Sequence, residues 1–326
     1  MKPVLLLLTA CLASGAPPDS KLHLVTDVRL PGHPVRFDYQ GLDADHHHLV
    51  IAHMRDDALV VVNTADGRTV KVLPEVPTVR GVAVGGDRIF ATALPDLLVV
   101  FDAAKLTELG RAHTGRAPDG VAWDGTDRRV GVSDQGDGTL SILSEAGLGA
   151  RTVVPLGDAT GNVVYDARRH RFWITVEHHG AAGTLAAIDP RRAAIERSFD
   201  LPGDCKGAHG LLLHPDGGSA FVACEDSDTL VRVDLATGAT RTGPTGHDPD
   251  VLSLDPGLAR LYVAAEAGPV SIYDMAAAGV TRLATQDVGK NAHSVRVDPS
   301  THHLFFPLAS GPDGMPTLRI MTPRAP

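Results

Sequence analysis

The chain has 326 residues, of which 43% are apolar and 21% are charged, and its formal net charge is −9. These values are typical of a folded globular protein and exclude an intrinsically disordered chain. The negative charge and the lack of any basic run argue against a nucleic-acid or anionic-membrane surface, because both need clustered Lys and Arg. With 34 Gly, 23 Pro and 4% aromatic residues, the composition favours many short strands over long helices.

The first twenty residues predict an export signal. Lys2 is followed by a short apolar stretch that ends near Leu12, and small residues and prolines come next. Such a stretch is too short to span a bilayer. We therefore expect the protein to be exported to the periplasm or cell envelope.

The signal contains a possible lipid-attachment site. Leu8 to Cys11 resembles the cleavage motif of bacterial lipoproteins, in which Cys11 would be acylated and become the mature N-terminus. Cleavage after Ala16 is the alternative. If Cys11 is acylated, the rest of the segment 1–20 is a tether, and a single folded domain is expected over 21–326.

Residues 21–30, KLHLVTDVRL, predict a strand, and a hairpin pattern then recurs seven times. Each copy has a short apolar run, a polar turn and a second apolar run, which is typical of a β-hairpin. The spacing of about 42 residues is that of propeller blades. The copies begin at Asp38, Arg80, Asp119, Gly161, His209, Asp250 and His293.

The remaining runs complete the predicted architecture. A third apolar run follows each hairpin, and a fourth follows most of them. Four antiparallel strands in each of seven copies predict an all-β fold, a seven-bladed β-propeller, in which only short, protected strand edges are left. The last copy ends after its third strand. We therefore expect the N-terminal strand at 21–30 to close the last blade.

The histidine-rich end of the chain is interpreted as part of this repeat. His302 and His303 fall in a hairpin turn, as do Asp45 to His48 in the first copy. We interpret both histidines as solvated turn residues. His293 is different, because it begins the innermost strand of its copy.

Cys205 and Cys224 are the two cysteines outside the signal. In an exported protein a disulfide is the leading interpretation, and two buried free thiols are the alternative. The predicted blade topology places both on one face of the fifth copy, which favours a bridge. A zinc site is not expected, because there is no second thiol pair and no Cys-x-x-Cys spacing.

The copies, such as "GLLLHPDGGSAFVACEDSDTLVRVDLATG", resemble the YncE-like, or YVTN-type, bacterial seven-bladed β-propeller proteins. The resemblance runs from about Phe37 to about Leu308 and includes "FDYQGLDAD" and "HSVRVDPSTHHLFFPL". The Tyr-Val-Thr-Asn motif is absent, and its positions hold "YVAAE", "FVACE" and "WITVE". The resemblance implies an exported propeller used for binding or scaffolding. More distant propellers include lactonases and dehydrogenase heavy subunits, so the fold names no activity.

In a propeller, the loops that enter the inner strands and those that leave the second strands converge on one mouth of the channel. Acids and histidines predominate at these places. The first set has Asp38, Arg80, Asp119, His209, Asp250 and His293, with Gly161 as the exception, and the second has His53, Asp134, Glu177, Glu225 and Glu266. Such a ring can hold a divalent metal such as Ca, Zn or Mn, or a cationic ligand. The alternative is a water-filled channel whose polar side chains bond with one another.

Common catalytic motifs are missing from the sequence. There is no Gly-x-Ser-x-Gly elbow, phosphate-binding loop, His-Glu-x-x-His helix or haem-attachment motif. "GVSDQGDG" is better explained as a blade loop than as a nucleophile site. "VEHHG", Glu177 to Gly180, is the densest group of possible ligands. Trp123 and Trp173 are expected to be occupied in blade packing.

The leading hypothesis is a non-enzymatic, surface-tethered protein that binds a protein, small ligand or metal at its acidic channel face. The alternative is a metal-dependent hydrolase of lactonase type, in which a divalent metal polarises a carbonyl and Glu177 or a channel histidine transfers the proton. A subunit that docks a redox partner is a third possibility. No nucleic-acid partner is expected, no cofactor is certain, and membrane contact is expected only through the lipid anchor.

Overall fold

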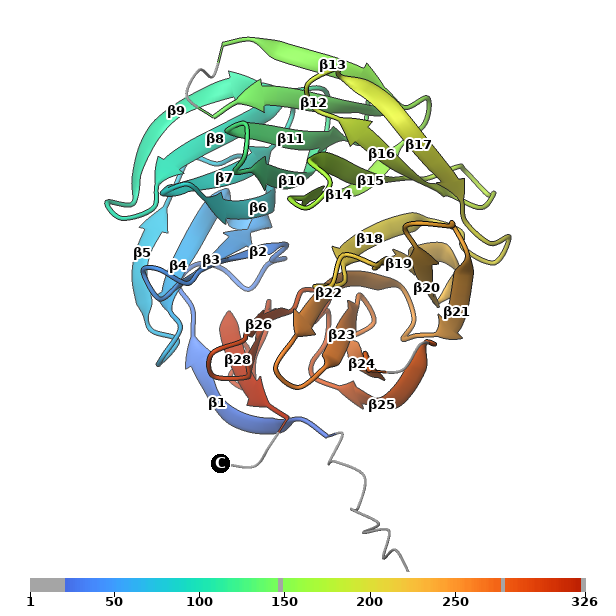
Figure 1. Ribbon diagram of the computed structural model, residues 1–326. Helices are drawn as coiled ribbons and strands as arrows, with labels where there is room; N and C mark the ends of the chain where they lie inside the picture. The colour runs from blue at the N-terminus through green and yellow to red at the C-terminus, as the bar shows by residue number, and fades with distance from the viewer. Residues whose placement is uncertain (1–20, 146–148, 277–278, 324–326) are drawn as a thin grey trace, which may run out of the picture.

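Figure 1 shows the computed structural model, in which small β-sheets surround a central axis. The structure describes residues 21–145, 149–276 and 279–323. Across these ranges there are seven antiparallel sheets of four strands each, and each sheet is one blade. The predicted all-β, seven-bladed propeller is thereby confirmed. Cys11 and the rest of the proposed signal and tether lie outside the described residues.

The strands of each blade follow one another outward from the axis. The inner strands of blades one to seven are β2 (Gln40–Asp43), β6 (Val79–Gly85), β10 (Pro118–Asp124), β14 (Thr160–Asp166), β18 (Ala208–Leu213), β22 (Pro249–Asp255) and β26 (Arg296–Asp298). The second strands are β3 (His48–His53), β7 (Arg88–Ala93), β11 (Arg129–Asp134), β15 (Arg171–Val176), β19 (Ser219–Cys224), β23 (Arg260–Ala265) and β27 (His303–Leu308).

The outer half of each blade is built in the same way. The third strands are β4 (Ala58–Asn63), β8 (Leu97–Asp102), β12 (Thr139–Ser144), β16 (Thr184–Asp189), β20 (Thr229–Asp234), β24 (Pro269–Asp274) and β28 (Thr317–Thr322). The outer strands are β5 (Thr69–Leu73), β9 (Thr107–His113), β13 (Arg151–Pro155), β17 (Ala194–Asp200), β21 (Thr240–Pro244), β25 (Thr281–Asp287) and, for blade seven, β1 (His23–Arg29). Short 3-10 turns, η1 (Met54–Asp56) and η2 (Glu225–Ser227), follow β3 and β19.

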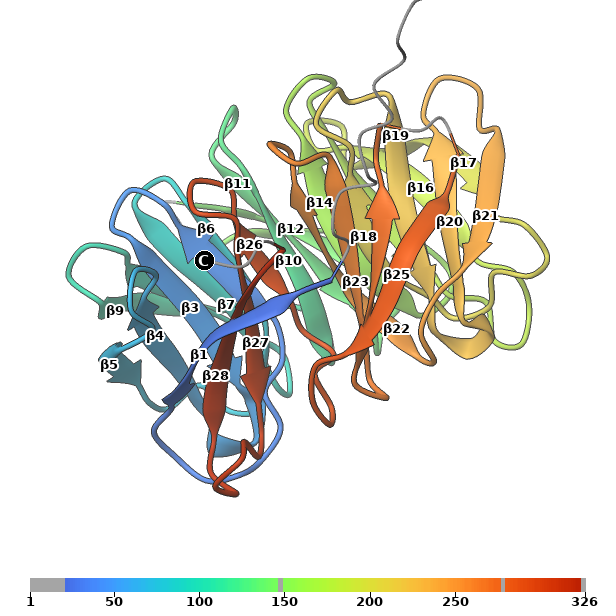
Figure 2. The same cartoon turned by 90° about the horizontal axis from the view of Figure 1, so that it is seen from below.

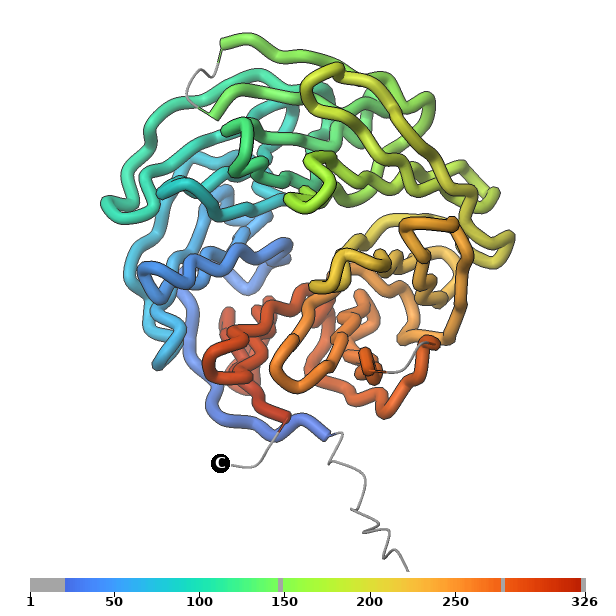
Figure 3. Tube along the Cα trace, in the orientation of Figure 1, coloured from blue at the N-terminus to red at the C-terminus, as the bar shows by residue number. Residues whose placement is uncertain are grey.

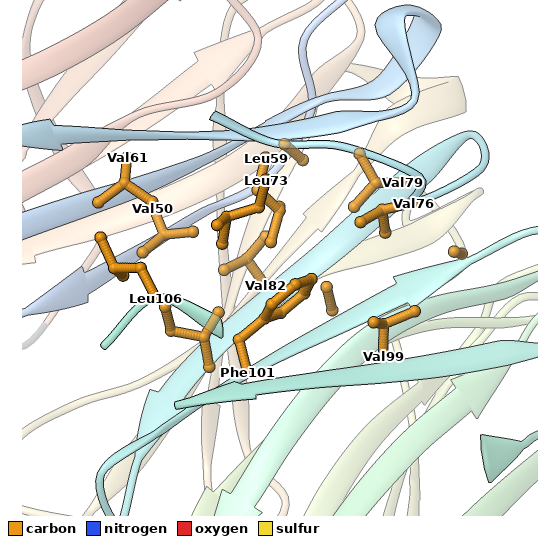
Figure 4. Close-up of a cluster of buried hydrophobic side chains, with 14 of the residues drawn as sticks. Val50, Leu59, Val61, Leu73, Val76, Val79, Val82, Val99, Phe101 and Leu106 are labelled. Atoms are coloured by element: carbon orange, nitrogen blue, oxygen red, sulfur yellow. The ribbon is translucent and has the colours of Figure 1, made fainter. Parts of the chain in front are cut away.

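The core lies between neighbouring blades. Figure 4 shows one of these layers, in which Val50 and Leu59 of blade one pack with Val82, Val99 and Phe101 of blade two. The second and third strands are covered on both faces, so they read as nearly continuous apolar runs rather than as alternating ones. Each such Val or Leu contributes about 1.5–3 kcal/mol when fully buried.

The first and last strands of the chain close the ring. β1 pairs antiparallel with β28, from His23 opposite Thr322 to Arg29 opposite Thr317, as expected from the sequence. Figures 2 and 3 show the blue start of the described chain beside its red end. Asp27 accepts two hydrogen bonds from the Arg319 guanidinium, at 2.9 and 2.7 Å. The closing sheet therefore joins parts of the chain that are almost 300 residues apart in sequence.

Five inner strands, β6, β10, β14, β18 and β22, have a bulge or a register shift near their first residues. A bulge turns a side chain away from the regular alternation and commonly occurs beside functional sites. The residue after the bulged position is often glycine. A Cβ on Gly210 would lie 1.9 Å from the Asp250 carbonyl oxygen, and one on Gly81 would lie 2.1 Å from that of Asp119. Glycine is needed here because the next blade's backbone approaches closely.

Hydroxyl groups connect some neighbouring blades next to the axis. Thr92 Oγ1 accepts a hydrogen bond from the Gly81 amide at 2.7 Å and donates one to the Asp119 carbonyl at 2.6 Å. Thr175 Oγ1 donates similarly to the His209 carbonyl, at 2.8 Å. These bonds fix the backbone that carries Asp119 and His209.

The two cysteines and the two tryptophans lie as expected from the sequence. Cys205 and Cys224 form a disulfide with a Cα–Cα distance of 5.1 Å, as expected. Trp173 is buried and stacks on Phe199, and Trp123 donates to Glu145, so both tryptophans are occupied in the packing of the blades. Among the described residues, no helix has the length and apolar character needed to cross a membrane.

The prediction that His302 and His303 are both solvated turn residues is wrong in part. His303 is the first residue of β27, and His302 lies in the turn before it. His302 Nδ1 lies 2.7 Å from Asp255 Oδ2, at the end of the inner strand of blade six. His302 is therefore only half-exposed, because the neighbouring blade provides this carboxylate.

Candidate ligand-binding site at the channel mouth

A cavity of about 520 Å³ lies at the predicted mouth of the channel. Its volume is within the usual range for small-ligand sites, but its walls are mostly polar. The walls come from the first residues of the inner strands and from the loops beside them, and the inner strands converge on the axis in Figure 1. The lining residues are Arg36, Asp38, Tyr39, Met54, Arg55, Arg80, Asp119, Gln135, His209, Glu225, Asp248, Asp250 and Glu266.

Most residues that the sequence placed at the mouth do lie there. Asp38, Arg80, Asp119, His209, Asp250, Glu225 and Glu266 line the cavity. Glu177 lies against one of them, because its Oε1 is 2.8 Å from His209 Nδ1. His293 is 1% exposed, and its Nε2 lies 3.9 Å from Asp38 Oδ1. Nine of the predicted residues are therefore brought into one neighbourhood.

Two predicted channel residues lie elsewhere. The His53 ring stacks on Phe37 with a centroid distance of 4.0 Å, and its Nε2 lies 3.2 Å from the His33 carbonyl oxygen. The Asp134 carboxylate accepts hydrogen bonds from the Gly115 amide and the Ser141 hydroxyl within its own part of the ring. Neither residue lines the cavity, so placing them at the mouth was wrong. His53 packs on the segment that precedes blade one, and Asp134 bonds to groups of blade three and the loop that leads into it.

The "VEHHG" segment does not act as one group of ligands. Glu177 faces His209 of blade five, whereas His178 Nδ1 lies 3.3 Å from Asp158 Oδ2 of its own blade. His179 is exposed. The three side chains diverge, so only Glu177 contributes to the site.

Tyr39 is at the centre of the site, although the sequence reading missed it. Its hydroxyl accepts a hydrogen bond from Asn162 Nδ2 at 2.8 Å, and it donates one to Asp250 Oδ1 at 3.3 Å. The Tyr39 hydroxyl oxygen also lies 3.1 Å from His209 Nε2. A signal for Tyr39 and Asn162 was present, because other copies have a smaller residue at the corresponding position, such as Gly210.

His209 is surrounded by acidic groups. Its Nδ1 faces Glu177, and its Nε2 lies 3.2 Å from Asp119 Oδ2 and 3.9 Å from Glu225 Oε1. Burial by itself would lower the pKa of His209, but the carboxylates of Glu225, Asp119 and Glu177 outweigh it and raise that pKa well above its ordinary value. His209 is therefore held as an imidazolium.

His293 has the opposite electrostatic environment. Burial, followed by the nearby positive charge of Arg36, lowers the pKa of His293 to about 4. Its Nδ1 lies 3.2 Å from the Asn291 carbonyl oxygen. A carbonyl only accepts hydrogen bonds, so Nδ1 carries the proton of the neutral ring.

Several acids at the mouth resist ionisation. Burial, reinforced by Asp119, raises the pKa of Asp38 to about 7, and burial likewise raises that of Glu225 to about 7. Burial followed by Glu225 raises the pKa of Asp250 well above its ordinary value. For Glu266, burial acts in the same direction but is outweighed by His293 and Arg36, so its pKa is lowered.

The charges of the lining residues do not cancel. Six carboxyl groups face three guanidinium groups and the His209 imidazolium. Protonation of the acids with a raised pKa reduces the excess of negative charge. A bound cation would balance the same charge and displace these protons. Chemically, the cavity suits a positively charged ligand.

Comparison with known proteins supports the fold and nothing finer. No protein-family model matches the chain, and no curated protein sequence matches it. A solved structure of Kuenenia stuttgartiensis hydrazine synthase is similar, with a TM-score of 0.74 and 14% identity over 83% of this chain and 92% of that one. A chain in a crystal structure of the mitotic checkpoint complex gives a TM-score of 0.77 with 12% identity, over 98% of both chains. At these identities only the seven-bladed propeller architecture is shared.

Proposed function

We propose that this protein is an exported binding protein that takes a positively charged ligand at the acidic mouth of its propeller channel. The observation that carries the proposal is the excess of carboxyl groups over cationic groups around an accessible cavity, with Asp38, Asp119 and Asp250 buried. Burial, followed by neighbouring acids, raises the pKa of Asp38 and of Glu225 to about 7, and a bound cation would stabilise both carboxylates by displacing their protons. This role agrees with the resemblance to the YncE-like propellers, of which we propose this chain is a member.

Thermal-shift and calorimetric titrations of the mature protein with spermidine test the proposal, with citrate as the anionic counterpart. Spermidine should bind and raise the melting temperature, and the effect should weaken as salt is added. The double variant Asp119→Asn/Glu225→Gln should lose the response. A variant with the same charge change at exposed positions, Asp66→Asn/Glu75→Gln, should keep it. Equal responses in the two double variants would contradict the proposal.

The proposed location is the periplasmic face of the cell envelope, with Cys11 as the lipid-bearing residue. The N-terminal pattern around Cys11 supports this location. Mass spectrometry of the mature N-terminus should find an acylated cysteine. A mature N-terminus at Pro17 would mean that the protein is exported without a lipid anchor.

A hydrolase of lactonase type is a second candidate. The observation that favours it is the Glu177 carboxylate at 2.8 Å from His209 Nδ1, since a carboxylate that orients an imidazole is a common feature of acid–base sites. Turnover of aliphatic lactones that is lost in His209→Gln would support this candidate. A binding protein without such turnover agrees with the first.

A further inference from the structure

Three buried side chains meet beside the cavity from separate blades. Asp38, Asp250 and His293 come from blades one, six and seven, and they are 4%, 4% and 1% exposed. One carboxylate oxygen of each aspartate and one ring nitrogen of His293 lie within 4.8 Å of one another. Each residue lies at or just before the start of its blade's inner strand, so closure of the ring brings them together.

His293 presents an unused lone pair to this group. Its Nδ1 donates to the Asn291 carbonyl, so Nε2 is the unprotonated nitrogen of the ring. Within the described part of the chain, Nε2 is buried and has no hydrogen-bond partner. A buried acceptor without a partner is costly, and native proteins usually avoid it. The arrangement matches that of metal-binding histidines, in which a backbone carbonyl orients the ring through its other nitrogen.

The facing acceptor is a carboxylate oxygen at bridging distance. Asp38 Oδ1 lies 3.9 Å from His293 Nε2. Two acceptors do not attract each other, but both can bind one cation placed between them. Donor atoms of a tetrahedral site with bonds of ~2.1 Å lie about 3.4 Å apart, so only a small side-chain adjustment is needed.

A second group with suitable spacing is a poorer metal site. His209, Glu225 and Asp250 also bring one donor atom each within 4.8 Å. However, both nitrogens of His209 already face acceptor oxygens, from Glu177 on one side and Asp119 on the other. A protonated imidazole has no lone pair for a metal.

We propose that Asp38, Asp250 and His293 hold one divalent transition-metal ion of the Zn²⁺ or Mn²⁺ kind, with an open coordination position toward the cavity. The imidazole ligand argues against Ca²⁺ and Mg²⁺, which prefer oxygen alone. Three protein ligands with a free position are the usual arrangement of metal sites that bind a further molecule. Tyr39 supports the site, because its hydroxyl donates to Asp250 Oδ1. This inference rests on the proposed function, since it names the cation.

Calorimetric titration of the tag-free mature protein with ZnCl₂ and with MnCl₂, after chelator treatment, tests this site. One ion should bind per chain. Loss of a direct ligand should exceed the 10–100-fold loss of affinity typical of supporting residues, so His293→Gln should weaken binding by about 100-fold or more. His247→Gln, a change at a histidine whose side chain is 78% exposed, should leave the affinity unchanged.

Cobalt provides a second readout that does not depend on stability. Co²⁺ added to the wild-type protein should give a visible absorption band, and Asp38→Asn should alter it even if His293→Gln does not fold. Equal metal affinity in wild type and both variants overturns the site, as does failure to bind one ion per chain. If spermidine binds while neither metal does, only this inference fails. If no cation binds, the proposed function fails with it.

Discussion

His209 donates from Nδ1 to Glu177 Oε1 over 2.8 Å, and this bond joins the inner strand of blade five to the loop that follows the second strand of blade four. The same ring faces Asp119 through Nε2 at 3.2 Å. An imidazole between two carboxylates is stabilised as the cation, whereas His293 is kept neutral by burial and by Arg36. Two histidines at or beside one cavity thus have opposite charge states.

Replacing Glu177 by Gln should lower the pKa of His209. Burial favours the neutral imidazole, and the variant lacks one of the carboxylates that offset this effect. In a histidine NMR titration, the wild-type His209 signal should stay in its protonated position through neutral pH. The Glu177→Gln signal should titrate at lower pH. Glu75→Gln, at an exposed site, should leave the signal unchanged. A wild-type His209 that titrates near 6.5 contradicts this assignment.

Replacing Glu225 by Gln should make stability less dependent on pH. The pKa of Glu225 in the folded protein is about 7, above its usual value, so the folded state retains a proton that the unfolded state loses first. As the pH rises from about 4.5 to about 7, this residue therefore lowers the free energy of unfolding of the wild type.

The comparison of Glu225→Gln with the wild type is best made by thermal melts in the presence of a chelator. The variant should gain melting temperature relative to the wild type as the pH is raised across that window. The two should differ little in this trend below the window, where Glu225 is protonated in both states. If the variant gained melting temperature relative to the wild type only as the pH is lowered, the pKa of Glu225 would not be raised in the folded protein.

Gly210→Ala should strongly destabilise the ring, because the new methyl group would lie 1.9 Å from the Asp250 carbonyl oxygen. Backbone of the next blade must shift to accommodate it, at a cost of about 3 kcal/mol or more. Gly203→Ala is a matched control from the loop that leads into the same blade, because nothing lies within 4 Å of its added Cβ. Denaturant unfolding of both variants measures the difference. Equal stabilities would mean that the blades are packed less closely than described.

A chain that starts at Pro31 should lose cooperative unfolding, because β28 is left without the partner that closes its sheet. A chain that starts at Lys21 should melt as the full mature protein does. Asp27→Asn is a milder test, since the ion pair with Arg319 is partly exposed, and it should cost about 1 kcal/mol or less. Calorimetry distinguishes these cases, and a sharp transition in the protein that starts at Pro31 would show that closure by β1 is dispensable.

The repeat made the ring and most of the mouth predictable. Because the copies share one register, the position of Asp119 in its copy also locates His209 and Asp250 in theirs. The missing fourth strand at the C-terminus likewise predicted the pairing of the N-terminal strand with β28.

The exceptions depend on contacts that the repeat does not encode. His53 is drawn to Phe37, which precedes the first copy, and Asp134 to hydroxyl and amide groups of its own surroundings. Tyr39 reaches across the axis to Asn162, which lies more than 120 positions away in the sequence. Such contacts follow from side-chain length and direction after the ring has closed.

The bulged inner strands affect how the ligand preference of such a protein can evolve. Asp119, His209 and Asp250 each lie at a position that points out of the regular sheet pattern, and each belongs to a different blade. A substitution at one of them alters the chemistry of the shared opening without moving the register of any strand pair. New ligand preferences are therefore accessible by single amino-acid exchanges on an unchanged scaffold.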